Sequence, residues 1–165
     1  MAFLKPLPAP LRMSDPAAFI ATWFGSGLLP KAPGTWGSLA ALPPGWLIFH
    51  YCGPEGLLIA AAAAFALGIW AAGVYARAAG NPDPSQVVID EVAALWLVLA
   101  TVPPTALAWT AAFLCFRLFD VVKPWPVSLA DRKIKGGFGI MADDIVAAIY
   151  AMLVLLLLRN FIEGV

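Results

Sequence analysis

The sequence predicts an all-α protein, a polytopic membrane helix bundle of about five apolar helices. Its hydrophobic fraction is 62% and its charged fraction is 12%, whereas soluble domains contain about 45–50% apolar and about 25% charged residues. Five apolar segments follow one another along the chain, at residues 38–51, 55–79, 88–101, 104–122 and 139–159. We expect the 165 residues to form one integral-membrane domain over 1–165.

A short N-terminal helix and an irregular loop come before these segments. Asp15 and Pro16 have the pattern of an N-cap followed by proline at the first helical position, which predicts a short helix through Phe24. Its aromatic side chains suit the membrane interface, and packing against the bundle is the alternative. Residues 25–38 are rich in Gly and Pro, and we interpret them as an irregular binding loop.

The apolar segments differ in their expected geometry. Pro43 and Pro44 predict a kink in segment 38–51. Segment 88–101 is shorter than the roughly 20 residues that a straight span needs. Segment 55–79 has small residues at every fourth position, which allow a neighbouring helix to approach closely and indicate packing; they are Ala60, Ala64, Gly68, Ala72 and Ala76.

The distribution of basic residues predicts the orientation. Lysines and arginines precede the first segment and lie at Arg77 and in the connection at 123–135, whereas the connections near 52–54 and 101–105 contain none. Cytoplasmic loops are enriched in Lys and Arg, so the N-terminus and the connection at 123–135 are expected inside the cell.

Several functional classes are not supported by the composition. Ten basic and ten acidic residues balance, without the basic run that binding to nucleic acid needs, and no obligate protein partner is evident. Cys52 and Cys115 lie in different segments with no Cys or His at ligand spacing, so we interpret both as small packing residues. The single histidine, His50, is predicted near the opposite face and is interpreted as structural.

The predicted topology gathers acidic residues at the cytoplasmic helix ends. Carboxylate oxygens suit a hard cation such as Mg²⁺, which usually shares its coordination shell with substrate phosphate. Solvated helix ends that favour the helix dipole are the alternative, but adjacent acidic pairs are costly unless a cation lies between them. The proposed metal ligands are Asp90, Glu91, Asp120, Asp143 and Asp144.

Cationic and hydroxyl side chains are expected beside these acids. One helix face is expected to carry three charged residues spaced by three, namely Arg117, Asp120 and Lys123. They could form an ion-pair ladder. Alternatively, Asp120 could bind metal while the neighbouring cations bind phosphate. The candidate substrate-binding residues are Lys31, Gly34, Thr35, Ser38, Arg117 and Lys123. The glycines of 136–139 resemble a phosphate-binding loop only weakly, and a hinge is equally consistent. Motifs for phosphohistidine, cysteine-phosphatase, aspartyl-phosphate, serine-hydrolase and Walker chemistry are missing, which favours metal-assisted displacement.

Three sequence blocks together resemble the bacterial phosphatidylglycerophosphatase A family. They are residues 31–39 (KAPGTWGSL), residues 88–91 (VIDE), and residues 116–126 (FRLFDVVKPWP) taken with 136–145 (GGFGIMADDI). The resemblance implies a Mg²⁺-dependent enzyme of the inner membrane that hydrolyses phosphatidylglycerophosphate to phosphatidylglycerol and phosphate. The family motifs fall on Lys31, Gly34, Thr35, Asp90, Glu91, Arg117, Asp120, Lys123, Pro124, Asp143 and Asp144.

A division of roles follows for a phospholipid substrate at the cytoplasmic face. The carboxylates would hold one or two Mg²⁺, with Asp144 or Glu91 as the general base, while Lys31, Arg117 and Lys123 would stabilise the developing charge. A metal-dependent phosphatidyltransferase of the CDP-alcohol type is an alternative, although its Asp-Gly-x-x-Ala-Arg run is missing. A small ion-coupled transporter is another alternative, although the acids cluster at helix ends and no inverted repeat is evident.

Overall fold

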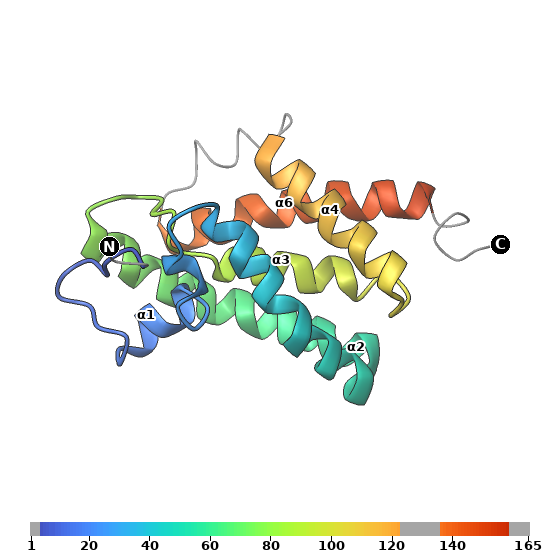
Figure 1. Cartoon of the computed structure of the whole chain (residues 1–165), viewed down its shortest axis with the longest axis horizontal. Coiled ribbons are helices and arrows are strands. Elements are labelled where there is room, and N and C mark those ends of the chain that lie inside the picture. The colour runs from blue at the N-terminus through green and yellow to red at the C-terminus, as the bar shows by residue number, and fades with distance from the viewer. Residues whose placement is uncertain (1–3, 123–135, 159–165) are drawn as a thin grey trace.

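The chain folds into helices that lie side by side along one long axis (Figure 1). The computed structural model describes residues 4–122 and 136–158, and no strand occurs within them. The helices are α1 (Pro16–Ala21), the 3-10 helix η1 (Ser26–Leu28), α2 (Pro33–Ala79), α3 (Ile89–Leu99), α4 (Ala106–Val122) and α6 (Gly137–Leu157). The all-α prediction is confirmed for this part of the chain.

Helix α2 consists of two antiparallel legs, which correspond to the first two predicted segments. Gly53, with φ 69° and ψ −175°, has the non-helical torsions inside α2. Only glycine adopts this region without strain, and the following Pro54 presets the backbone torsion of the returning leg. Figure 1 shows the chain reversing at the far tip of α2. The reversal therefore lies at Gly53. The backbone stays helical through Pro43 and Pro44, where the sequence predicted a kink.

The first segments of the chain differ from the prediction in two places. Helix α2 begins at Pro33, so the last six residues of the expected loop at 25–38 are helical. Gly37 has no side chain and lies directly against Val88, so packing stabilises this early part of α2. The N-terminal helix ends at Ala21 rather than at Phe24.

The early end of α1 has a local cause. Thr22 donates its hydroxyl to the carbonyl of Ala18 (2.7 Å) and accepts the backbone N–H of Gly25 (3.2 Å), so its side chain satisfies backbone groups at the helix end. Trp23 and Phe24 then adopt positive φ values of 45° and 58°. Asp15 is the N-cap residue as predicted, but its carboxylate accepts the N–H of Arg12 at 2.6 Å and makes no cap hydrogen bond.

Helix α3 forms the centre of the bundle. Nearly all of its residues are buried, and it packs against α2, α4 and α6. Trp96 donates its indole N–H to the carbonyl of Ala41 on the first leg of α2 at 2.9 Å. With 11 residues, α3 is shorter than the roughly 20 that cross a bilayer, as the sequence indicated.

Large apolar side chains cover the outside of the bundle, while alanines and glycines fill much of its inside. Exposed examples from three helices are Ile59, Leu67, Leu114, Leu118, Leu153 and Leu156. Helices α2 and α6 are long and apolar enough to cross a membrane by length and composition. An apolar exterior over a core of small residues is the arrangement expected for helices that contact lipid.

The stripe of small residues on the second leg of α2 is a packing surface, as predicted. Ala64, Gly68, Ala72 and Ala76 are buried, and a Cβ at Gly68 would lie 2.5 Å from the sulfur of Met141 on α6. At the start of α6, a Cβ at Gly137 would overlap the backbone carbonyl of Ile69. The stripe therefore sets how closely α6 approaches α2.

We predict that Gly137→Ala lowers the free energy of unfolding by about 1–3 kcal/mol, the usual cost of overpacking, because the obstructing atoms are backbone. Gly73→Ala is the matched control, since a Cβ there would find its nearest neighbour at 3.5 Å. Denaturant unfolding in detergent measures both. Equal stability of the two variants would contradict this account of the α2 and α6 contact.

Candidate functional site

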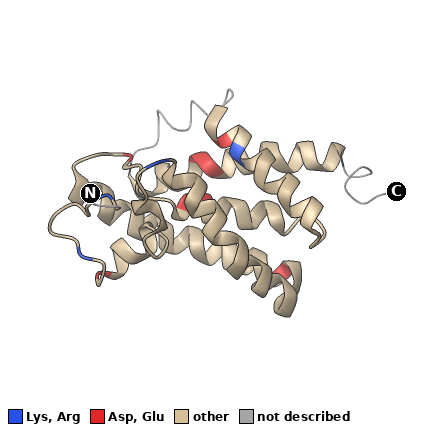
Figure 2. Cartoon of the chain, in the orientation of Figure 1, with Lys and Arg blue, Asp and Glu red and all other residues tan. Residues whose placement is uncertain are grey.

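A cavity of about 400 Å³ lies at the end of the bundle where the start of α2, the start of α3 and the end of α4 meet α6. Figure 2 shows that acidic and basic segments gather toward this end, whereas the opposite half is almost free of charge. The charged residues that line the cavity are Asp83, Asp90, Glu91, Arg117, Asp120, Asp143 and Asp144. All five acids predicted to cluster are therefore brought together.

Three of these acids form a compact group. One carboxylate oxygen from each of Asp90, Glu91 and Asp144 lies within 4.8 Å of the others. Asp90 and Asp144 are only 9% and 4% exposed. Burying like charges at this spacing is expensive unless a cation balances them. The geometry therefore suits a positively charged ligand.

The helix positions of the acids separate the binding interpretation from the capping interpretation. Asp90 and Glu91 lie in the first turn of α3, where the helix dipole favours negative charge. We expected Asp143 and Asp144 to open their helix, and this prediction is wrong, because α6 already begins at Gly137 and its first turn contains no acid. Helix capping therefore cannot account for Asp143 and Asp144.

Arg117 connects α4 to the acidic group. Its Nη1 lies 2.5 Å from Oδ2 of Asp120, one turn along the same helix, and 3.4 Å from Oε1 of Glu91 on α3. The predicted face shared by Arg117 and Asp120 is confirmed. Arg117 is also the one basic side chain among the described residues that line the cavity.

Within residues 4–122 and 136–158, several buried polar atoms at the site lack a hydrogen-bond partner. They are Oδ1 of Asp90, Oε2 of Glu91, Oδ2 of Asp144 and Nε of Arg117. Buried polar groups are nearly always paired, and exceptions in a cavity indicate a ligand. Carboxylate oxygens without N or S ligands match the preference of Mg²⁺ and Ca²⁺, so the residues present fit a hard divalent cation.

Gly34 allows the N-terminus of α2 to approach the acids. A Cβ at this position would overlap Oε1 of Glu91 and lie 3.1 Å from Nη1 of Arg117. Gly34 therefore contributes by having no side chain. This leaves room for Glu91 and Arg117 to lie directly against the first turn of α2. Ala32 and Pro33, just before it, also line the cavity.

The other predicted substrate-binding residues are not all at the cavity. Lys31 is exposed, Thr35 is half-buried and Ser38 is buried, and none of the three is among the described lining residues. The hydroxyl of Ser38 has no protein hydrogen-bond partner. Lys123 and Pro124 lie outside the described residues. The roles of these residues remain predictions.

Sequence reasoning missed one wall of the cavity. Pro82, Asp83, Ser85 and Val87, from the segment between α2 and α3, line it together with Gly136 and Gly139. The available signal was the run of turn-forming residues at 80–85, which directly precedes the Asp90 and Glu91 pair in the chain. The glycines at 136–139 were noted, and two of them do line the site.

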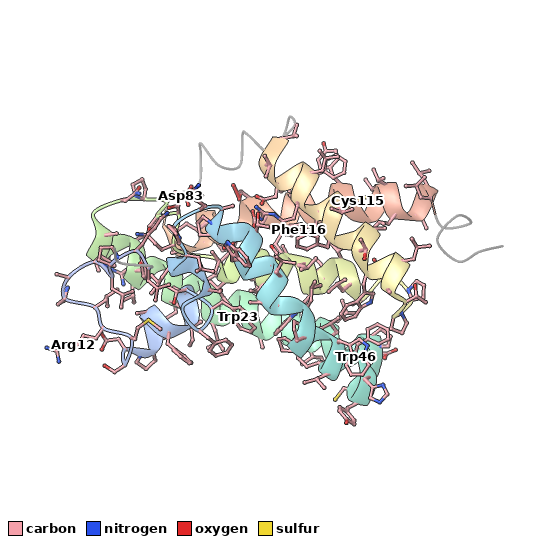
Figure 3. The ribbon with its side chains drawn as sticks, viewed as in Figure 1. Arg12, Trp23, Trp46, Asp83, Cys115 and Phe116 are labelled. Atoms are coloured by element: carbon pink, nitrogen blue, oxygen red, sulfur yellow. The ribbon has the colours of Figure 1, made fainter. Side chains whose placement is uncertain are left out.

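The described residues that line the cavity do not include the three residues interpreted as structural or packing residues, which are His50, Cys52 and Cys115. His50 stacks on Trp46 with ring centroids 5.0 Å apart, and Figure 3 shows Trp46 near the far tip of α2. Cys115 is partly buried on α4 (Figure 3). Cys52 is exposed, so its interpretation as a packing residue is wrong: the reversal at Gly53 puts Cys52 at the surface of the tip.

Comparison with known proteins gives a consistent result. Residues 19–159 match the model of the family described as "Phosphatidylglycerophosphatase A". A Haemophilus influenzae protein of that name is 41% identical over 145 residues, which cover 87% of this chain and 89% of the relative. The Escherichia coli K12 protein of that name is 39% identical over 140 residues, which cover 84% and 81% respectively.

A third relative has a different description. A Bacteroides thetaiotaomicron protein with the provisional name phosphatidylinositol-3-phosphatase is 39% identical over 149 residues, which cover 85% of this chain and 91% of the relative. No solved structure matches the chain. The matched residues 19–159 include all the acids and Arg117 of the cavity.

The contacts of Arg117 predict a competition with metal. Because its guanidinium neutralises Glu91 and Asp120, Arg117→Met should bind Mn²⁺ at least about tenfold more tightly, as expected for removing a positive charge a few ångströms away. Arg117→Lys keeps the charge and should bind Mn²⁺ as the unchanged protein does. Titration calorimetry in detergent measures both affinities. Unchanged or weaker binding by Arg117→Met would show that its charge does not oppose the metal.

Proposed function

Because the chain belongs to the phosphatidylglycerophosphatase A family, we propose that it hydrolyses the phosphomonoester of phosphatidylglycerophosphate to phosphatidylglycerol and phosphate. The observation that supports this most directly is the cavity in which Asp90, Glu91 and Asp144 converge beside Arg117. Among the described residues this buried acidic group has one adjacent guanidinium, so it suits a dianionic phosphate only when further positive charge is added. This requirement points to a metal-dependent phosphatase.

Asp90, Glu91 and Asp144 would hold the metal, and Asp120 and Asp143, which line the same cavity, are proposed as further oxygen ligands. Mg²⁺ is the proposed ion because the donors are carboxylate oxygens and the substrate is a phosphate. When bound, it would supply the positive charge that draws in the phosphate and makes a water molecule more acidic.

The side chains of the chain itself perform the remaining steps. Asp144 or Glu91 would accept a proton from the attacking water as the new bond to phosphorus forms. Arg117 would donate from its guanidinium to phosphoryl oxygens and stabilise their charge. The bond from phosphorus to the glycerol oxygen breaks, and that oxygen takes up a proton from solvent water, while the protonated general base returns its proton to solvent. Lys31 and Lys123 are proposed to assist at the leaving-group side.

We place the site at the cytoplasmic face of the bacterial inner membrane. Three features support this placement: the apolar exterior of the bundle, the concentration of charge toward one end, and the arginines and lysines that precede α2 or lie in the connection at 123–135. The first leg of α2, residues 33–52, has about the length that crosses the hydrocarbon core. Trp46, His50 and Tyr51 near its far end suit the opposite interface.

The identity of the head group depends on more than the acids. A relative with the provisional name phosphatidylinositol-3-phosphatase has similar identity to this chain over nearly its full length. Removal of a phosphomonoester from a polyol is common to both descriptions. Glycerol is proposed here because the two relatives described as phosphatidylglycerophosphatases and the family model agree.

The proposed function is tested by phosphate release from phosphatidylglycerophosphate in mixed micelles. We predict turnover by the purified protein with Mg²⁺, loss of turnover on chelation, and recovery when Mg²⁺ is restored, because the acidic group alone repels the substrate. Inorganic phosphate and phosphatidylglycerol are measured separately. Full hydrolysis in excess chelator would contradict the metal requirement, and cytidine nucleotide-dependent transfer would instead support a phosphatidyltransferase.

Substitution of single acids separates catalysis from packing. Asp144→Asn and Asp120→Asn keep the side-chain volume but remove the charge that holds metal, so each should lower turnover by at least about 100-fold. Thermal unfolding in detergent and the elution volume should stay close to those of the unchanged protein.

The matched controls for these acids lie at the far tip of α2. Glu55→Gln removes an exposed carboxylate there, and His50→Ala removes the stacked ring; both should retain near-normal turnover. Retention of most activity by folded Asp144→Asn and Asp120→Asn would mean that the acids are structural.

A further inference from the structure

The mouth of the cavity carries a carboxylate that the chemistry of phosphate removal does not need. Asp83 lines the cavity from the segment between α2 and α3, and its side chain is exposed. Figure 3 places it toward the end of the bundle where the charged segments of Figure 2 gather. It does not belong to the compact acidic group of the described residues, which contains Asp90, Glu91 and Asp144. A negative charge at the opening of an anion site weakens anion binding unless it serves another contact.

Backbone and side-chain contacts fix this part of the mouth. The N–H of Asp83 donates to Oδ1 of Asn81 at 3.1 Å, and the N–H of Val87 donates to the carbonyl of Pro84 at 2.9 Å. These two bonds hold the turn on either side of Asp83 without using its carboxylate. Asp83 therefore has a defined position and an available acceptor group.

Ser85 supplies a complementary donor on the same segment. Its side-chain oxygen accepts a hydrogen bond from Nζ of Lys5 at 3.2 Å. The backbone N–H of Lys5 donates in turn to the carbonyl of Leu28 at 2.7 Å, which ties the N-terminal segment to η1. Because the oxygen of Ser85 already accepts from an ammonium group, its own O–H is available to donate to a further acceptor, and Ser85 lines the cavity.

We propose that Asp83 and Ser85 recognise the free hydroxyl of the polyol that carries the scissile phosphate. The hydroxyl donates to the carboxylate of Asp83 and accepts from Ser85, so one alcohol group satisfies both. This inference rests on the proposed function, in which the phosphomonoester binds at the acids and Arg117. The next atoms of the head group then pass the mouth of the cavity, where Asp83 and Ser85 lie.

The chemistry favours a hydroxyl over the other groups that could lie there. A phosphate oxygen would be repelled by Asp83, and an acyl chain would leave both polar side chains without a partner. A neutral alcohol meets neither objection. Asp83 and Ser85 are therefore specificity residues that distinguish a phosphorylated polyol head group from a phosphate attached directly to diacylglycerol.

The test compares two lipids that differ in this feature. In identical mixed micelles, kcat/KM is measured for phosphatidylglycerophosphate, which has the hydroxyl, and for phosphatidate, which has none. Asp83→Ala should lower kcat/KM at least tenfold for the first lipid, mainly through KM, and leave the second unchanged or improved. Asp83→Asn keeps an acceptor oxygen and should recover part of the loss. Glu55→Ala, an exposed acid at the far tip of α2, is the matched control and should change neither value.

A soluble pair of inhibitors keeps the test decisive if phosphatidate is not turned over. Glycerol 3-phosphate carries the hydroxyls and inorganic phosphate does not, so Asp83→Ala should weaken inhibition by the first and not by the second. The assignment of Asp83 is overturned if Asp83→Ala lowers kcat/KM equally for both lipids or weakens inhibition equally by both inhibitors. It is also overturned if the substitution changes neither value in either pair. Failure of the unchanged protein to hydrolyse phosphatidylglycerophosphate would overturn the proposed function itself and this inference with it.

Discussion

The balance of charge around Arg117 is the constraint on which the functional end of the bundle depends. Four acids, Asp90, Glu91, Asp143 and Asp144, line the same cavity on α3 and α6, and Asp120 adds a fifth from α4. The guanidinium reaches Glu91 and Asp120 through one nitrogen and leaves other carboxylate oxygens without a protein partner. Among the described residues, the single positive charge of Arg117 cannot neutralise Asp90, Glu91, Asp120 and Asp144 at this degree of burial. The described part of the fold therefore brings together more negative charge than its own basic side chains balance, which is the property of a cation site.

Close helix packing makes this concentration of charge possible. The acids come from three helices, and their carboxylates can converge only if the helix backbones lie close together. Gly34 lets the start of α2 lie against Glu91 and Arg117, and Gly137 lets α6 lie against Ile69 of α2. The inside of the bundle is filled largely by small residues, alanine and glycine, while larger apolar residues such as Leu114 cover the outside. Large apolar side chains on the outside are favourable where lipid, and not water, contacts them.

Features carried by local patterns could be predicted from the sequence, and features set by tertiary contacts could not. The acidic group and the pair of Arg117 and Asp120 follow from residue type and helical spacing, and the apolar segments locate α4 and α6 closely. The start of α2 at Pro33 was missed because its glycines are poor helix formers in isolation and are stabilised by packing against α3. Asp83 was missed because it lies in a polar turn without a catalytic motif, and only the fold brings that turn to the cavity.

The two walls of the cavity differ in how firmly they are held, and this difference has a functional consequence. Asp90 and Asp144 lie on packed helices and are nearly inaccessible, so a side chain of different volume there would disturb the bundle as well as the chemistry. Asp83 and Ser85 lie on a connection fixed by a few hydrogen bonds, where a side chain can change at little structural cost. A scaffold of this kind can keep one reaction at its buried wall while the exposed wall adapts to different head groups. The place to look for substrate specificity is therefore the connection between α2 and α3, and not the acids.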